Sequence, residues 1–124
     1  MGKIIIYYLS YCPHSMEAIR TLRSISNIEL KEKLSDNNKE EIKSKNIKKY
    51  NHHTFPLILY QSEETGKKYY IGGNDKLQEI IREVNIKSKI STEEIPKCIT
   101  SYYNRTEGEQ RFICYLLVKK NYIL

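Results

Sequence analysis

The chain has 124 residues, which is enough for one compact domain with a single hydrophobic core and too few for two ordinary domains. Hydrophobic residues make up 40% and charged residues 29%, and no run nears the roughly 18 apolar residues of a membrane span, which excludes disordered, fibrous and membrane-spanning proteins. An excess of 21 Lys and Arg over 15 Asp and Glu gives a net charge of +6, but abundant Lys, Asn, Ile and Tyr are also what an AT-rich genome encodes. We therefore do not expect nucleic acid or a membrane as a partner, and the lack of a signal-peptide cleavage site predicts a cytoplasmic protein.

The first predicted elements are a buried strand and an amphipathic helix. Residues 3 to 9 are almost all apolar and β-branched or aromatic, as expected of a strand buried on both faces in an α/β sheet. Pro13 suits the first position of the following helix, where its missing N–H would have no partner. The apolar face of this helix consists of Met16, Ile19, Leu22 and Ile25.

The next two predicted elements are more polar. Residues 28 to 33 alternate in polarity and predict a short strand. Residues 36 to 49 predict a polar helix in which only Ile42 and Ile47 face inward.

A hairpin and a helix complete the pattern. Residues 57 to 60 and 68 to 71 predict two strands joined by the turn-rich residues 62 to 66. Asn74 or Asp75 can cap the last helix, whose apolar face consists of Leu77, Ile80, Ile81 and Val84. The predicted order is β-α-β-α-β-β-α, an α/β fold with a four-stranded mixed sheet.

Beyond this pattern we predict a boundary, with a domain over residues 1 to 86 and a C-terminal extension over residues 87 to 124. Thr106 and Glu109 have the spacing of a capping box ahead of the apolar run 112 to 118, which favours a helix, although a strand fits that run equally well. Pro96 opens a shorter predicted helix that continues to residue 103. We expect the extension to pack on the domain or to form an interface, in a monomer or a dimer.

Cys12 stands between the first strand and the first helix, so its thiol is predicted at a helix N-terminus. The free N–H groups and partial positive charge there stabilise a thiolate, the species that attacks disulfides, and His14 and Ser15 could add hydrogen-bond donors. From position alone, a small buried structural thiol fits equally well. Cys98 and Cys114 lie far along the chain, so the three cysteines predict free thiols and no metal site; the latter two are expected in the core of the extension, unless one resolves Cys12.

Four separated motifs resemble those of the glutaredoxin family and occur in the same order. They are Cys12-Pro13-His14-Ser15, similar to its Cys-Pro-x-Cys/Ser active site; Thr54-Phe55-Pro56, similar to its Thr-x-Pro segment; Ile71-Gly72-Gly73, similar to its paired glycines; and Asn74-Asp75, similar to its glutathione-gripping helix start. The resemblance covers about two-thirds of the chain. It implies a thioredoxin-like fold in which the peptide bond before Pro56 is cis.

The resemblance also implies that Cys12 is the nucleophile and that glutathione is the co-substrate. Phe55 would pair its backbone with the cysteinyl part of glutathione, next to Pro56. Helix N–H groups would receive the γ-glutamyl carboxylate, and Asp75 its amine. The implied glutathione-binding residues are Tyr11, Lys49, His53, Thr54, Phe55, Pro56, Gly73, Asn74 and Asp75.

Two positions depart from the family pattern. Leu9 stands where the family has a lysine that holds a glutathione carboxylate, so Lys49 or His53 would have to supply that charge. For His53 and its neighbour His52, two solvated residues without a role fit equally well. Ser15 stands where a resolving cysteine would be, which predicts a monothiol route through a mixed disulfide between Cys12 and glutathione.

The predicted function is therefore a glutathione-dependent thiol–disulfide oxidoreductase that reduces glutathione mixed disulfides, with glutathionylated proteins as its partners. One alternative is an iron–sulfur cluster held between two subunits, with glutathione as a further ligand. Another is a scaffold whose basic extension binds a partner.

Overall fold

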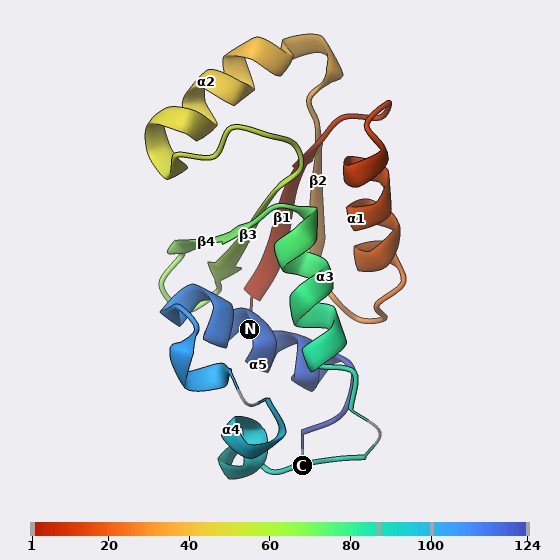
Figure 1. Cartoon of the computed structure of the whole chain (residues 1–124), viewed down its shortest axis with the longest axis vertical. Helices are drawn as coiled ribbons and strands as arrows, with labels where there is room; N and C mark the ends of the chain where they lie inside the picture. The colour runs from red at the N-terminus through yellow and green to blue at the C-terminus, as the bar shows by residue number, and fades with distance from the viewer. Residues whose placement is uncertain (1, 87, 100, 124) are drawn as a thin grey trace.

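The computed structural model describes residues 2–86, 88–99 and 101–123 (Figure 1). Among these residues, no helix has the length and the apolar character that crossing a membrane would require. The elements, with η for a 3-10 helix, are β1 (Gly2–Tyr8), α1 (Pro13–Arg23), β2 (Leu30–Leu34), η1 (Asp36–Asn38), α2 (Lys39–Tyr50), β3 (Leu57–Ser62), β4 (Lys68–Gly72), α3 (Asn74–Glu83), η2 (Thr92–Glu94), α4 (Ile95–Cys98), η3 (Tyr102–Asn104) and α5 (Glu107–Lys119).

The four strands form one mixed sheet in the order β2-β1-β3-β4. β1 pairs in parallel with β2, because α1 returns the chain to the same end of the sheet, and it pairs antiparallel with β3. β3 and β4 form an antiparallel hairpin. The predicted β-α-β-α-β-β-α order and the four-stranded mixed sheet are confirmed.

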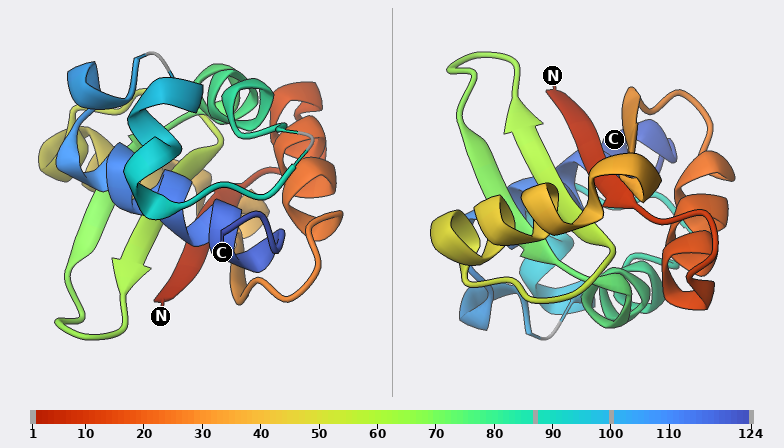
Figure 2. Two further views of the ribbon diagram at one scale, coloured as in Figure 1. Left: turned by 90° about the horizontal axis from the view of Figure 1, so that it is seen from below. Right: turned by 90° about the horizontal axis from the view of Figure 1, so that it is seen from above.

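Alternation along the strands divides the apolar residues between two faces of the sheet. Ile4 and Ile6 of β1 belong to the larger core, which α1, α3 and α5 cover. Ile5 points the other way and packs with Leu57, Leu59 and Tyr50 of α2. Figure 2 shows this arrangement, with α2 crossing in front of the strands in its right-hand view.

Helix α2 buries a polar side chain. Ile42 and Ile47 are only half-buried, while Asn46 is 6% exposed. Residues 42, 46 and 50 are four apart and therefore share one helix face, so Asn46 lies in the row that Tyr50 fixes against the sheet. The prediction that Ile42 and Ile47 alone face inward is thus wrong.

The apolar run near the C-terminus forms a helix, α5, which resolves the choice between helix and strand. Thr106 caps it, since its Oγ1 accepts a hydrogen bond from the N–H of Glu109 at 3.1 Å. Phe112 and Tyr115 are buried in the larger core. The single helix predicted from Pro96 onward is wrong: α4 and η3 are two separate short helices, and residue 100 between them lies outside the described residues.

A buried arginine joins the extension to α3. The Arg105 side chain is 4% exposed and forms ion pairs with Glu83 at 2.9 Å, Glu79 at 3.1 Å and Glu109 at 3.3 Å. Three carboxylates around one guanidinium satisfy its donors, and the Glu109 side chain is itself only 9% exposed. The extension is therefore fixed to the helix whose first turn borders the candidate site described next.

Candidate functional site

Cys12 is the N-cap residue of α1. Its backbone is extended, and its carbonyl accepts the hydrogen bond from Met16 N at 3.0 Å that opens the helix. Pro13 occupies the first helical turn, as predicted, and no acidic residue stands in that turn. The half-buried thiol therefore lies at the end of the helix where backbone N–H groups have no partner within the helix, and no first-turn carboxylate stands beside it.

Ser15 is fully buried beneath the turn that carries Cys12. Its Oγ accepts a hydrogen bond from the backbone N–H of Leu9 at 3.2 Å. The hydroxyl is thus used to hold the end of β1 against α1. Leu9 is itself 4% exposed, so this position contributes packing where a lysine would contribute charge.

The loop before β3 contains the cis peptide bond between Phe55 and Pro56 that the resemblance implies. His52 supports this loop. It is 7% exposed, and its Nε2 donates to the Pro56 carbonyl oxygen at 2.9 Å. Since a carbonyl only accepts, the neutral ring leaves Nδ1 to accept from the Tyr70 hydroxyl at 2.8 Å. Burial lowers the pKa of His52 and raises that of Tyr70, which favours this neutral pair.

The structure separates the two adjacent histidines. His53 is exposed and lies 3.0 Å, Nε2 to Oδ1, from Asn51. His52, one residue earlier, is buried in the site. The interpretation of both as solvated residues is therefore wrong for His52. Nothing in the local sequence distinguishes the two, because the difference arises from contacts with Pro56 and with Tyr70 on β4.

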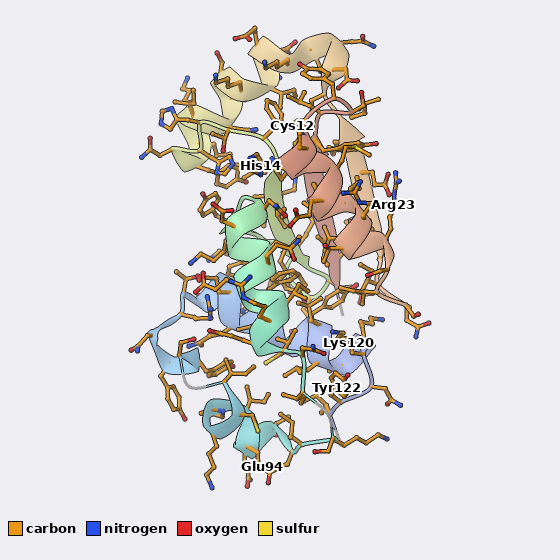
Figure 3. All side chains as sticks on the ribbon, turned by 45° about the vertical axis from the view of Figure 1, so that its right-hand side comes forward. Cys12, His14, Arg23, Glu94, Lys120 and Tyr122 are labelled. Carbon is orange, nitrogen blue, oxygen red and sulfur yellow. The ribbon has the colours of Figure 1, made fainter. Side chains whose placement is uncertain are left out.

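A hollow of about 520 Å³ lies between the loop before β3, the end of β4 and the start of α3. We call it the α3 hollow. The predicted residues that line it are His14, Thr54, Phe55, Pro56, Gly73, Asn74 and Asp75. The lining residues that were not predicted are His52, Tyr70, Ile71, Gly72, Lys76 and Glu79. Cys12 is not among the lining residues, but Figure 3 labels it next to His14, which lines the hollow, at the start of α1.

Three of the predicted glutathione-binding residues lie outside the lining of the α3 hollow. Tyr11 is 62% exposed, with the ammonium of Lys39 5.9 Å from its ring centre. Lys49 lies over the ring of Tyr50 at 5.5 Å. His53 contacts Asn51. None of them forms part of the wall in this structure.

The start of α3 offers both signs of charge to the hollow. Gly73 is its N-cap, so the N–H groups of the next residues have no partner within the helix. Asp75 is exposed in the first turn. Lys76 lines the hollow and forms ion pairs with Glu79 at 3.5 Å and Glu109 at 3.8 Å. This end can hold a carboxylate and an amine together.

The other two cysteines are free thiols in a different part of the molecule. Cys98 ends α4 and is exposed, so the prediction of a core thiol is wrong for this residue. Figure 3 shows Glu94, the N-cap of α4, at the opposite end of the molecule from Cys12. The Sγ of Cys114 lies 3.6 Å from the hydroxyl of Tyr102, whose pKa is raised to about 12 by burial. Within the described ranges, no three His, Cys, Asp or Glu side chains cluster as metal ligands.

Comparison with known proteins identifies the fold. The structure is similar to the solution structure of the dithiolic glutaredoxin 2-C-Grx1 from the pathogen Trypanosoma brucei brucei, with a TM-score of 0.54 and 21% sequence identity. The similarity covers 66% of this chain and 79% of that chain. No protein-family model matches the sequence, and no curated protein matches it either. The α/β fold with its mixed sheet is that of thioredoxin-like glutaredoxins, as the motifs implied.

Proposed function

We propose that this protein is a glutathione-dependent thiol–disulfide oxidoreductase that works by a monothiol mechanism. The observation that carries the proposal is the position of Cys12, at the N-terminus of α1 and beside a hollow lined by Thr54, Phe55 and Pro56. A thiolate at a helix N-terminus is a nucleophile, and an adjacent hollow can hold the molecule that carries the disulfide.

The reaction consists of two exchanges. The Cys12 thiolate attacks the glutathione sulfur of a glutathionylated protein, the mixed disulfide breaks, and the protein thiol leaves with a proton. The thiolate of a second glutathione then attacks the sulfur of the bound glutathione, which releases glutathione disulfide and restores the Cys12 thiolate. Ser15 has no thiol to offer, so the thiolate that releases the bound glutathione must come from a second glutathione.

The α3 hollow has polar groups for the cysteinyl and γ-glutamyl parts of glutathione. No hydrogen bond of the Phe55 backbone is present among the described residues, so its N–H and carbonyl are available to the cysteinyl part. His52 occupies the Pro56 carbonyl. The N–H groups that open α3, with Lys76, suit the γ-glutamyl carboxylate, and Asp75 suits its amine.

Lys49 and His53 remain the proposed partners of the glycyl carboxylate. Both lie outside the lining of the hollow, at the end of α2 and in the loop that follows it. Exchanging either for Ala in an assay with varied glutathione tests this role through the KM. Among the described residues no contact favours the iron–sulfur alternative, which stays a prediction.

A coupled assay tests the proposed function. The purified protein is given a glutathionylated peptide, glutathione, glutathione reductase and NADPH, and turnover is followed as NADPH consumption. Cys12→Ser should abolish turnover, and intact mass should show one glutathionyl group on the wild type and none on this variant. The matched control is Cys98→Ser combined with Cys114→Ser, which should retain full turnover. Turnover by Cys12→Ser would contradict the proposal.

A further inference from the structure

The sheet face that α1, α3 and α5 leave uncovered carries four lysines. Gln61 pairs with Lys3 on one neighbouring strand and with Lys68 on the other. Lys31 and Lys33 pair with Ile5 and Tyr7, so the four lysines lie on one face of the sheet. We call this surface the lysine face. Its ten strand positions are Lys3, Ile5, Tyr7, Lys31, Lys33, Leu57, Leu59, Gln61, Lys68 and Tyr70, and none of them is acidic.

Helix α2 lies on the same side and adds to the charge. Tyr50 packs it against this face, and α2 contains five lysines and two glutamates. The nine lysines and two glutamates of the lysine face and α2 carry +7, while the whole chain carries +6. All other residues together are therefore slightly negative. A bias in composition would add lysines to every side, so it does not account for an excess on one side.

The lysines of this face are not used in ion pairs. In the ranges that the structure describes, none of the four strand lysines pairs with a carboxylate, whereas Glu32 on the opposite face pairs with Arg23. Lys31 and Lys68 are exposed, and Lys33 lies over the ring of Tyr7 at 5.8 Å. Their charges are free to meet a partner.

The apolar floor of the lysine face is already covered. Ile5, Leu57 and Leu59 are between 0% and 2% exposed, and Tyr7 and Tyr50 pack against them. A protein partner usually needs an apolar anchor that enters a pocket at the centre of the interface, and this face offers none. At one end, Glu29 and Glu63 line a small hollow with Lys3 and mark the limit of the positive surface.

We propose that the lysine face and α2 bind nucleic acid through its phosphate backbone, without regard to base sequence. A broad surface of lysines, of which only Lys45 pairs with a carboxylate among the described residues, suits a polyanion whose charges repeat along its length. Lysine acts as a point charge toward phosphate and lacks the two-pronged geometry with which arginine reads bases. This role is separate from the thiol chemistry.

Fluorescence anisotropy tests the proposal. Two labelled single-stranded DNA oligonucleotides of unrelated sequence are titrated with the full chain between about 50 and 200 mM salt. Both should bind with similar affinity, and the slope of log K against log salt should be about −3 or steeper, since each phosphate contact contributes about −0.7. Lack of binding at the lowest salt would overturn the proposal.

Two variants that lose the same charge localise the binding. The test variant replaces Lys3, Lys31, Lys33 and Lys68 by Gln. The control variant replaces Lys89, Lys97, Lys119 and Lys120 by Gln. The test variant should bind at least about tenfold more weakly at low salt and lose about three units of slope, while the control should change by less than about threefold. Equal losses in both variants would refute a localised site.

Three further measurements separate DNA binding from misfolding, from protein binding and from the thiol chemistry. If the circular dichroism spectrum of the fourfold variant differs from that of the wild type, a double variant with Lys31→Gln and Lys68→Gln is used in its place. Both of these lysines are exposed. Displacement of the DNA by an acidic polypeptide at equal charge concentration would assign the face to proteins and overturn the proposal. Cys12→Ser should bind DNA like the wild type, so a failure of the redox proposal would leave this result unchanged.

Discussion

The Nε2 atom of His52 lies 2.9 Å from the carbonyl oxygen of Pro56, within the loop that borders the candidate site. The same ring accepts a hydrogen bond from Tyr70 on β4, so one buried imidazole joins the loop before β3 to the opposite wall of the α3 hollow. Its Nε2 donates to the Pro56 carbonyl, and the N–H and carbonyl of Phe55 remain available to bind a ligand. His52 is therefore a positioning residue for the proposed glutathione site.

We expect His52→Ala to raise the KM for glutathione by about 2- to 10-fold, because net hydrogen bonds of about 0.5–1.5 kcal/mol that hold the loop are lost. The kcat at saturating glutathione should stay within about twofold, since His52 does not carry the reacting thiol. Steady-state kinetics with varied glutathione measure both constants. Tyr70→Phe, which removes only the Nδ1 partner, should cause a smaller rise. A lower melting temperature with an unchanged KM would show that His52 stabilises the fold and nothing more.

Burial of His52 also predicts how stability depends on pH. Its pKa in the folded protein is lowered from 6.5, chiefly by desolvation, so the unfolded chain binds a proton at a pH where the folded protein does not. The contribution of the neutral ring is complete above a pH of about 6.5 and is lost as the pH falls through the lower folded pKa. The melting temperature of the wild type should therefore fall as the pH drops below 6.5, and His52→Gln should lack this part of the fall. Parallel curves for the two proteins would contradict this assignment.

Arg105 should be a main source of stability for the extension. Arg105→Met leaves the buried carboxylate of Glu109 without its closest cation and removes the link to α3, and we expect a loss of about 3 kcal/mol. For a chain of this size, that is a fall in melting temperature of about 10 °C. Arg111→Met is the control, because its pair with Glu107 is exposed and should contribute less than about 0.5 kcal/mol. Similar effects of the two variants would show that burial of Arg105 matters little.

The elements of the fold follow from local patterns, and the errors have physical causes. Continuous apolar runs predicted β1 and β3, and the apolar stripe on one helix face predicted α1 and α3. α2 lacks such a stripe. Its buried residue, Asn46, was missed because its position depends on Tyr50 and the sheet. The helix predicted after Pro96 ends at Cys98 because the backbone of Ile99 leaves the helical conformation, although Ile95, Ile99 and Tyr102 keep helical spacing.

The candidate site could be predicted where it depends on short motifs. Cys12, Phe55, Pro56 and the start of α3 carry recognisable residues at fixed places in a chain of this fold. His52 and Lys76 were missed, because their roles depend on contacts with Tyr70 and Glu109 from distant elements. The charge of the lysine face was missed for a similar reason, since only strand pairing reveals which lysines share a face.

Ser15→Cys should convert the proposed monothiol site into one that closes its own disulfide. Residue 15 follows Cys12 within the first turn of α1. The Ser15 hydroxyl accepts one hydrogen bond, from the Leu9 N–H, and a buried thiol is a weaker acceptor for it. We expect oxidation of this variant to give an intramolecular disulfide, seen as a loss of two hydrogens in intact mass and as protection of both thiols from alkylation. The glutathionylated form should become a minor species, since the new thiol attacks the mixed disulfide from within the chain. Ser15→Ala is the control and should keep the monothiol pattern at a small cost in stability. Stable glutathionylation of Ser15→Cys without an internal disulfide would mean that residue 15 cannot reach the Cys12 sulfur.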